Sequence, residues 1–201
     1  MTALDLLLPS SCAGCGRRGA TCCAACLDSF GPPNAVKVPG VGPPVWTLAA
    51  YHGPARELVL AFKERGARAL SAWFGAMVAA ALASVGSAPW TLVPAPSRVS
   101  AARVRGGDHM LRVARAVEIA AVAPVLRLAP GVVDSVGLSA GARRRNLEGR
   151  VEVCGRPPPG TTVLLDDVIT TGATAAACVR ALRRAGVRTH AVVALTSARP
   201  Q

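Results

Sequence analysis

Two adjacent acidic residues, Asp166 and Asp167, stand directly before a turn that is rich in threonine and glycine. The apolar residues before them, 162–165, predict a buried strand, and residues 173–185 predict an amphipathic helix. Gly172 allows the backbone to curl so that successive N–H groups converge on one anion, and the N-terminus of the helix adds partial positive charge. The turn therefore predicts a cradle for a phosphate monoester.

The two carboxylates need a role of their own, because they repel a phosphate beside them. Accepting hydrogen bonds from vicinal ribose hydroxyls gives them one, and a Mg²⁺-bound sugar pyrophosphate is compatible with the same pair. The hydroxyls of Thr170, Thr171 and Thr174 can donate to the phosphate. A Walker A loop is excluded, since its Gly-Lys-Ser/Thr ending is absent. The alternative is an ordinary strand-to-helix turn with threonine caps.

Paired cysteines near the start of the chain have the spacing of a metal site. Cys12 and Cys15 form one C-x2-C pair, Cys23 and Cys26 form a second, and seven residues separate the pairs. Two such turns can place four thiolates at the corners of a tetrahedron, so they predict a structural zinc site. A redox C-x2-C pair and disulfides are the alternatives, and the adjacent Cys22 can compete as a ligand.

The remaining pattern predicts an α/β fold. The strand–helix–strand unit over residues 162–195 implies a parallel sheet with helices on its faces. Residues 108–121 are expected to form a helix with Asp108 as its N-cap. The polar, Gly- and Arg-rich residues 129–150 are expected to form a long exposed loop.

Length and cysteine positions indicate two parts. A chain of 201 residues is the size of one α/β domain with a small appendage. The Pro/Gly-rich stretch 31–44 predicts a linker or an irregular cover, because it can be neither regular helix nor central strand. We therefore expect a Cys₄ zinc module with its linker over residues 1–45 and the main domain over residues 46–201.

Residues 163–174 resemble the signature with which type I phosphoribosyltransferases bind phosphoribosyl pyrophosphate (PRPP). The resemblance implies the parallel sheet of that family and a ligand that is carried with Mg²⁺. In the family the acidic pair contacts ribose hydroxyls, and the loop after it holds the 5-phosphate. By this resemblance the PRPP-binding residues are Asp166, Asp167, Thr170, Thr171, Gly172, Ala173 and Thr174. Some nucleobase-salvage members carry an Asp where this chain has Thr170, which argues against purine salvage.

The same resemblance gives roles to two further segments. The tight turn after the predicted strand 89–94 is placed like the pyrophosphate loop of these transferases, and its backbone amides and arginine suit a diphosphate. Its residues are Pro96, Ser97 and Arg98. The expected long loop corresponds to one that can close over bound PRPP. Its basic residues are Arg143, Arg144 and Arg145, for which a solvated loop and a nucleic-acid contact are the alternatives.

The cysteine module, the Pro-rich join and the PRPP-type loop together resemble the ComF family of competence-related proteins. The likeness covers most of the chain and includes residues 51–66 with Lys63, residues 93–98 and residues 138–147. Members of that family usually continue an Arg-Gly pair with Phe-Asn-Gln. This chain instead continues Arg105-Gly106 with Gly-Asp-His, so the resemblance assigns no substrate contact to that segment.

The three histidines, His52, His109 and His190, have no visible partner arrangement in the sequence. No Ser/His/Asp or Cys/His constellation is visible either. We therefore expect each histidine to be a surface or packing residue.

The net charge of +12, from 23 Lys and Arg against 11 Asp and Glu, suits phosphate-rich partners, although a biased base composition is an alternative source. No stretch approaches the ~20 apolar residues that span a bilayer, so we expect no membrane insertion and a cytoplasmic protein.

Two functions are compatible with the sequence. One function is a Mg²⁺-dependent phosphoribosyltransferase that binds PRPP or a related ribose 5-phosphate ligand. The other is a non-catalytic module of the competence machinery that binds single-stranded DNA electrostatically.

Overall fold

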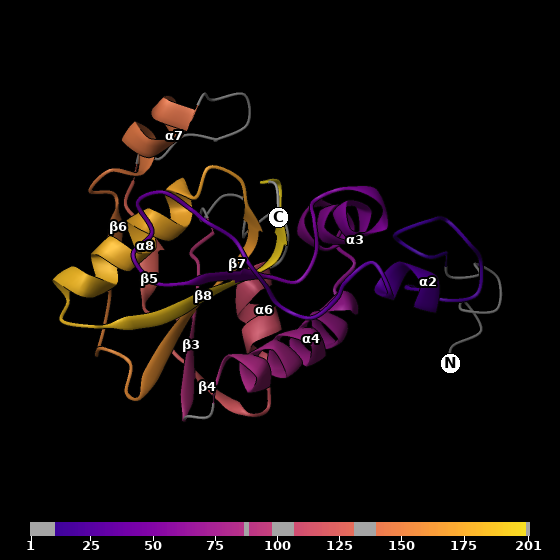
Figure 1. The fold of residues 1–201 in the computed structure, drawn as a ribbon, viewed down its shortest axis with the longest axis horizontal. Helices are drawn as coiled ribbons and strands as arrows, with labels where there is room; N and C mark the ends of the chain where they lie inside the picture. Colours follow the sequence, from indigo (N-terminus) through magenta and orange to yellow (C-terminus); the bar gives the residue numbers. More distant parts are fainter. Residues whose placement is uncertain (1–10, 87–88, 98–106, 131–139, 200–201) are drawn as a thin grey trace.

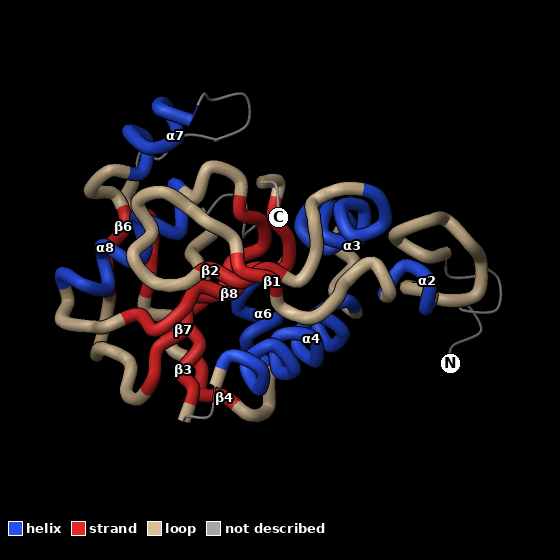
Figure 2. Tube along the Cα trace, in the orientation of Figure 1, coloured by secondary structure: helices blue, strands red, loops and turns tan. Residues whose placement is uncertain are grey.

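A computed structural model describes residues 11–86, 89–97, 107–130 and 140–199. Its centre is a six-stranded sheet in the order β1-β2-β8-β7-β3-β4 with helices on its faces (Figures 1 and 2). Neighbouring strands are parallel except for β1 and β2, and β5 pairs with β6 in a separate antiparallel sheet. This confirms the predicted class, a mostly parallel sheet flanked by helices. The strands are β1 (Asn34–Ala35), β2 (Val45–Thr47), β3 (Trp90–Pro94), β4 (Ala120–Val122), β5 (Leu126–Leu128), β6 (Val151–Val153), β7 (Thr161–Ile169) and β8 (Thr189–Ser197).

Alternation along the central strands divides the core into two layers, because successive side chains of a strand point to opposite faces. Val163 and Leu165 of β7 belong to one cluster of buried residues, together with residues of α3, α4 and α6. Leu164 belongs to a second cluster, together with residues of α8. The helices are α2 (Ala24–Leu27), α3 (Gly53–Glu64), α4 (Leu70–Val85), α6 (His109–Arg115), α7 (Ala140–Leu147) and α8 (Ala173–Arg184).

The predicted strand–helix–strand unit is confirmed as β7, α8 and β8, whose two strands are parallel neighbours. Glycines with positive φ stand at both ends of its helix, Gly172 at +79° before α8 and Gly186 at +76° after it. The chain turns back after the helix, where the N–H of Val187 donates to the carbonyl of Leu182 at 2.9 Å. Strand β7 continues to Ile169 instead of ending at Leu165 as expected, so Asp166 and Asp167 lie within the strand and residues 170–172 form the turn into α8.

Two expected elements were wrong. The loop expected over 129–150 contains helix α7, because alanine and arginine are good helix formers and Leu147 is buried in the second core cluster. The helix expected over 108–121 ends at Arg115. Residues 120–122 instead form β4, because their backbone pairs with β3 at the sheet edge.

The Pro/Gly-rich stretch is largely irregular, as expected, but β1 within it pairs with β2, which pairs with β8. Val36 and Val38 from the same stretch are buried in the second core cluster. The cysteine segment also packs on the main core, since Cys12 and Cys26 belong to the first cluster. The division into residues 1–45 and 46–201 stays a prediction.

Candidate functional site

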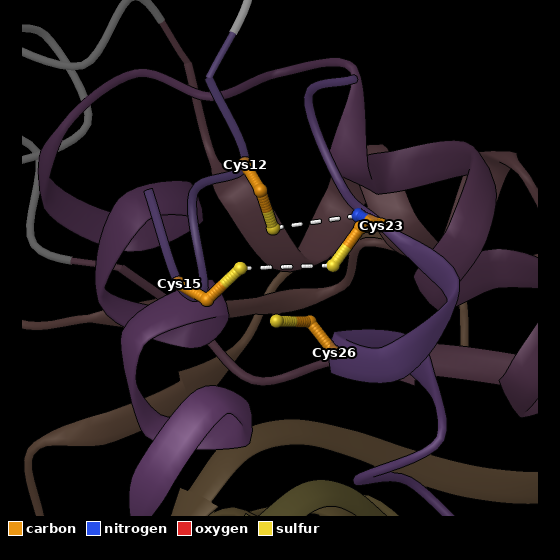
Figure 3. Close-up of side chains that lie close together, drawn as sticks. All are labelled: Cys12, Cys15, Cys23 and Cys26. Atoms are coloured by element: carbon orange, nitrogen blue, oxygen red, sulfur yellow. Dashed lines mark hydrogen bonds between the residues drawn. The ribbon is translucent and has the colours of Figure 1, made fainter. Parts of the chain in front are cut away.

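Four cysteine thiols converge on one point in the segment that contains α2 (Figure 3). The sulfur atoms of Cys12, Cys15, Cys23 and Cys26 all lie within 4.8 Å of one another, so they can hold a metal ion such as zinc. The fifth nearby thiol, Cys22, is not part of this group. None of the four forms a disulfide. The predicted ligand set is therefore brought together by the fold.

Backbone donors favour the thiolate form at one member of this cluster. Burial opposes ionisation of Cys12, but backbone N–H groups of Cys23, Cys15 and Gly14 lower its pKa to about 6. The N–H of Cys23 lies 3.3 Å from the sulfur. Burial raises the pKa of Cys22 to about 11, which keeps that thiol protonated. Burial also raises the pKa of Cys26, well above its usual value, so the position of the sulfur atoms, and not their acidity, places Cys26 in the ligand set and Cys22 outside it.

Asp166 and Asp167 are both buried near the carboxyl end of β7. As neighbours on one strand they face opposite layers of the core. On one side, burial and the charge of Asp166 raise the pKa of Cys178 in α8. On the other side, Asp167 contacts residues of α3 and α6. Backbone N–H groups bind each carboxylate: that of Asp167 donates to Asp166 at 2.9 Å, and that of Val168 donates to Asp167 at 2.7 Å.

Lys63 and His109 both contact the Asp167 carboxylate. Lys63 Nζ lies 2.7 Å from Oδ2 of Asp167, and His109 Nε2 lies 2.8 Å from the same oxygen. Lys63 comes from the last turn of α3, which packs near β8, and His109 is the first residue of α6. The site is thus built at the carboxyl edge of the sheet from two helices and the central strand (Figure 1).

These contacts separate the acidities of the two aspartates. Burial and the charge of Asp167 raise the pKa of Asp166 to about 7. Burial also opposes ionisation of Asp167, but Lys63 and His109 outweigh it and hold the pKa of Asp167 far below its usual range. Although burial lowers the pKa of Lys63, the Asp167 charge raises it overall. Near neutral pH, the site contains an Asp167–Lys63 ion pair beside a carboxyl that titrates.

This difference predicts a pH dependence of stability. The folded protein holds a proton on Asp166 that the unfolded chain, with a pKa of 3.8, releases. The contribution of Asp166 therefore lowers the free energy of unfolding as pH rises from about 4 to about 7, by on the order of 4 kcal/mol at most. Asp166→Asn should remove this fall, which urea denaturation at pH 5 and pH 8 measures. Glu148→Gln, at an exposed carboxylate, is the control, and an unchanged pH slope in Asp166→Asn would contradict the assignment.

His109 is buried and its ring packs against Phe62, as expected of a packing residue, but it also has polar partners that the sequence did not show. Its ring is buried and bonds Asp167 through Nε2 and the Ser97 hydroxyl through Nδ1, the latter at 3.2 Å. The local signal was its place directly after Asp108, which the structure confirms as the N-cap of α6, accepting from the N–H groups of Met110 and Leu111. A helix that starts at the carboxyl edge of a parallel sheet directs its first side chains toward the site found there.

The phosphate-type turn begins after Ile169, the last residue of β7. Thr170 is exposed, Thr171 is half-buried and accepts from the N–H of Ala173 at 3.3 Å, and Gly172 is the left-handed residue that opens α8. Ala173 and Thr174 form the start of that 12-residue helix. A side chain at position 172 would overlap Val38, so the Pro/Gly-rich stretch packs directly against the turn.

Of the other predicted site residues, some lie beside the acidic pair and others lie elsewhere. Pro96 and Ser97 follow β3, and the N–H of Ser97 donates to Asp108 at 3.0 Å, so this turn lies beside the start of α6. Arg98 lies outside the described residues. Arg143 and Arg144 lie in α7, and Arg145 is exposed on that helix, which packs against α8. The fold therefore brings Ser97, but not the described Arg145, into contact with the His109–Asp167 pair.

A cavity of about 460 Å³ lies away from the acidic pair, where the segment after α2 meets the start of α3. Asp28, Asn34, Thr47 and His52 line it, and no residue predicted for the PRPP or metal site does. The acidic pair therefore lies outside this cavity.

Fold and site together define a mixed α/β protein with an N-terminal four-cysteine cluster and an acidic pair at the carboxyl edge of its sheet. A comparison with protein-family models found no match, and a search of curated proteins found none either. Among the described residues, no helix has the length and apolar character needed to cross a membrane.

Proposed function

We propose that the chain binds PRPP, or a related ribose 5-phosphate ligand carried with Mg²⁺, in the manner of the ComF family and other type I phosphoribosyltransferases. The observation that carries this proposal is the position of the acidic pair. Asp166 and Asp167 lie near the carboxyl end of the central parallel strand β7, and the left-handed Gly172 in the turn after that strand opens α8. Ligands of open parallel sheets bind at this edge, and phosphates bind where a helix begins.

The geometry is consistent with separate roles for the strand end and the turn. The carboxylates accept hydrogen bonds from the ribose hydroxyls, and residues 170–174 hold the 5-phosphate with backbone N–H groups and threonine hydroxyls. The turn of Pro96 and Ser97 supports the diphosphate, since β3 and β7 are adjacent parallel strands whose carboxyl ends meet. We expect Mg²⁺ to be bound by the diphosphate oxygens of the ligand.

The charges around the acidic pair support an anionic ligand. Two ionised carboxylates would repel a phosphate, but Lys63 neutralises Asp167 and burial raises the pKa of Asp166 to about 7. The pair therefore carries little net negative charge near neutral pH. The aspartates that accept hydrogen bonds from ribose hydroxyls can therefore lie next to the turn that binds the phosphate.

Calorimetric titration with PRPP and Mg²⁺ tests the proposal. Wild-type protein should bind, and Asp166→Ala should bind about 10-fold more weakly, because a ribose hydroxyl left without its buried partner costs about 1–3 kcal/mol. Chelating Mg²⁺ should weaken binding as well. Asp28→Ala, at an exposed acid near the cysteine cluster, should bind like wild type. Absence of PRPP binding by the wild type, or equal binding by Asp166→Ala, would refute the proposal.

The reaction class that follows is transfer at the anomeric carbon, with pyrophosphate as the leaving group. Such catalysis relies on positioning and charge neutralisation more than on a protein nucleophile. The alternative function, an electrostatic module for single-stranded DNA, stays a prediction whose support is the net charge of +12.

A further inference from the structure

Ser97, His109 and Asp167 form one hydrogen-bonded chain at the carboxyl edge of the sheet. The Ser97 hydroxyl lies 3.2 Å from Nδ1 of His109, and Nε2 of the same ring lies 2.8 Å from Oδ2 of Asp167. The three residues come from the turn after β3, the first residue of α6 and the end of β7. No single segment of the sequence contains this arrangement.

The ionised carboxylate determines the positions of the protons in this chain. Because Asp167 is held in its charged form, it can only accept, so Nε2 of His109 must carry a hydrogen. The neutral ring then has its lone pair on Nδ1, and the Ser97 hydroxyl must donate to it. When the ring is protonated, Nδ1–H donates to Ser97 Oγ instead, which frees the hydroxyl hydrogen for another acceptor.

The three hydrogen-bonded residues differ in their exposure to solvent. The side chains of His109 and Asp167 are each only 9% exposed, whereas Ser97 is half-buried. Ser97 is therefore the member through which the ring can reach a ligand. The charged groups that face the ring are Lys63 from α3 and Asp167 of β7, and Asp166 acts on it only through its charge, from the other face of the strand. Asp108 of its own helix is occupied by capping and by the Ser97 N–H.

We propose that Ser97 and His109 deliver a proton to the diphosphate of the bound ligand. This inference rests on the proposed function and adds a group that handles protons to a site whose turn lacks a carboxylate at Thr170. Ser97 contacts a diphosphate oxygen, and His109 acts through Ser97 as the positioning residue and proton source. Asp167 orients the ring, and Lys63 keeps Asp167 charged.

The proton transfer balances as follows in the direction of pyrophosphate release. The bond between the anomeric carbon and the diphosphate oxygen breaks, and its electron pair stays on that oxygen. The Ser97 hydroxyl proton passes to the diphosphate, and the Nδ1 proton of His109 passes to Ser97 Oγ. An N–H or O–H acceptor bonds to the anomeric carbon and releases its own proton to solvent, which returns one to Nδ1.

Proton uptake on ligand binding tests this inference. A diphosphate at Ser97 should favour the protonated ring, so PRPP with Mg²⁺ should bind with uptake of up to about one proton per chain, measured by calorimetry in buffers of different ionisation enthalpy. His109→Gln keeps hydrogen-bonding groups but cannot titrate, so it should remove that uptake. His190→Gln is the matched control, because His190 packs against Trp90 at the opposite end of the sheet and should retain it.

The outcomes separate this inference from the proposed function. PRPP binding with the same uptake in wild type and His109→Gln would overturn the proton-delivery role and leave PRPP binding intact. Failure of the wild type to bind PRPP would overturn both. Nitrogen NMR of the labelled ring gives an independent readout without ligand: the neutral ring should carry its hydrogen on Nε2, and a hydrogen on Nδ1 would overturn the inference whatever PRPP does.

Discussion

Cys15→Ser is expected to abolish stoichiometric zinc binding and to unfold the segment that contains the cysteine cluster. Structural zinc sites have apparent binding free energies on the order of 10 kcal/mol, and this free energy stabilises the fold directly. Cys15 is the exposed member of the four, so its replacement removes a ligand without opening a cavity in the core. The loss should spread to α3, because Cys12 and Cys26 share a buried cluster with Leu58.

Metal analysis and thermal unfolding of the purified protein measure this effect. Wild type should contain about one zinc ion per chain and should lose stability when a chelator removes it. Cys154→Ser changes a half-buried cysteine outside the cluster and should leave zinc content unchanged. If Cys15→Ser retains one zinc ion per chain, or if chelation leaves the unfolding temperature of wild type unchanged, the cluster is not a structural metal site.

Gly172→Ala is expected to destabilise the protein by about 2–5 kcal/mol. A left-handed backbone costs an L-residue roughly 1–2 kcal/mol, and overpacking adds about 1–3 kcal/mol. Both costs arise at this position, because φ is +79° and the new Cβ would overlap Cγ1 of Val38. The same change should weaken PRPP binding, since the turn would have to move away from Val38. Chemical denaturation and PRPP titration measure the two effects.

Gly186→Ala is a matched control at the other end of α8. Its φ is +76°, but a Cβ there has no neighbour within 4 Å, so it should show only the backbone cost of about 1–2 kcal/mol. The double change Gly172→Ala with Val38→Ala should cost less than the sum of the single changes, because the overlap is removed. Equal losses from Gly172→Ala and Gly186→Ala would show that Val38 does not restrict the turn.

Sequence patterns correctly predicted the structural features whose interacting residues lie close together in the sequence. The strand–helix–strand unit could be predicted because its apolar runs and Gly186 are contiguous. The cysteine cluster could be predicted because two short C-x2-C turns need only a single loop to meet. The α7 region was misjudged because polar composition alone does not distinguish an exposed loop from a surface helix with one buried leucine.

The sequence by itself determined the mostly parallel α/β class, the four cysteines that meet, and an acidic pair followed by a glycine turn into a helix. Only the tertiary structure decided what Asp167 contacts. His109 lies 58 positions before Asp167, and Lys63 comes from a different helix, so neither pairing produces a local pattern. Adjacent parallel strands and the helices packed on them bring these side chains to one edge, where burial and a shared carboxylate change their acidities.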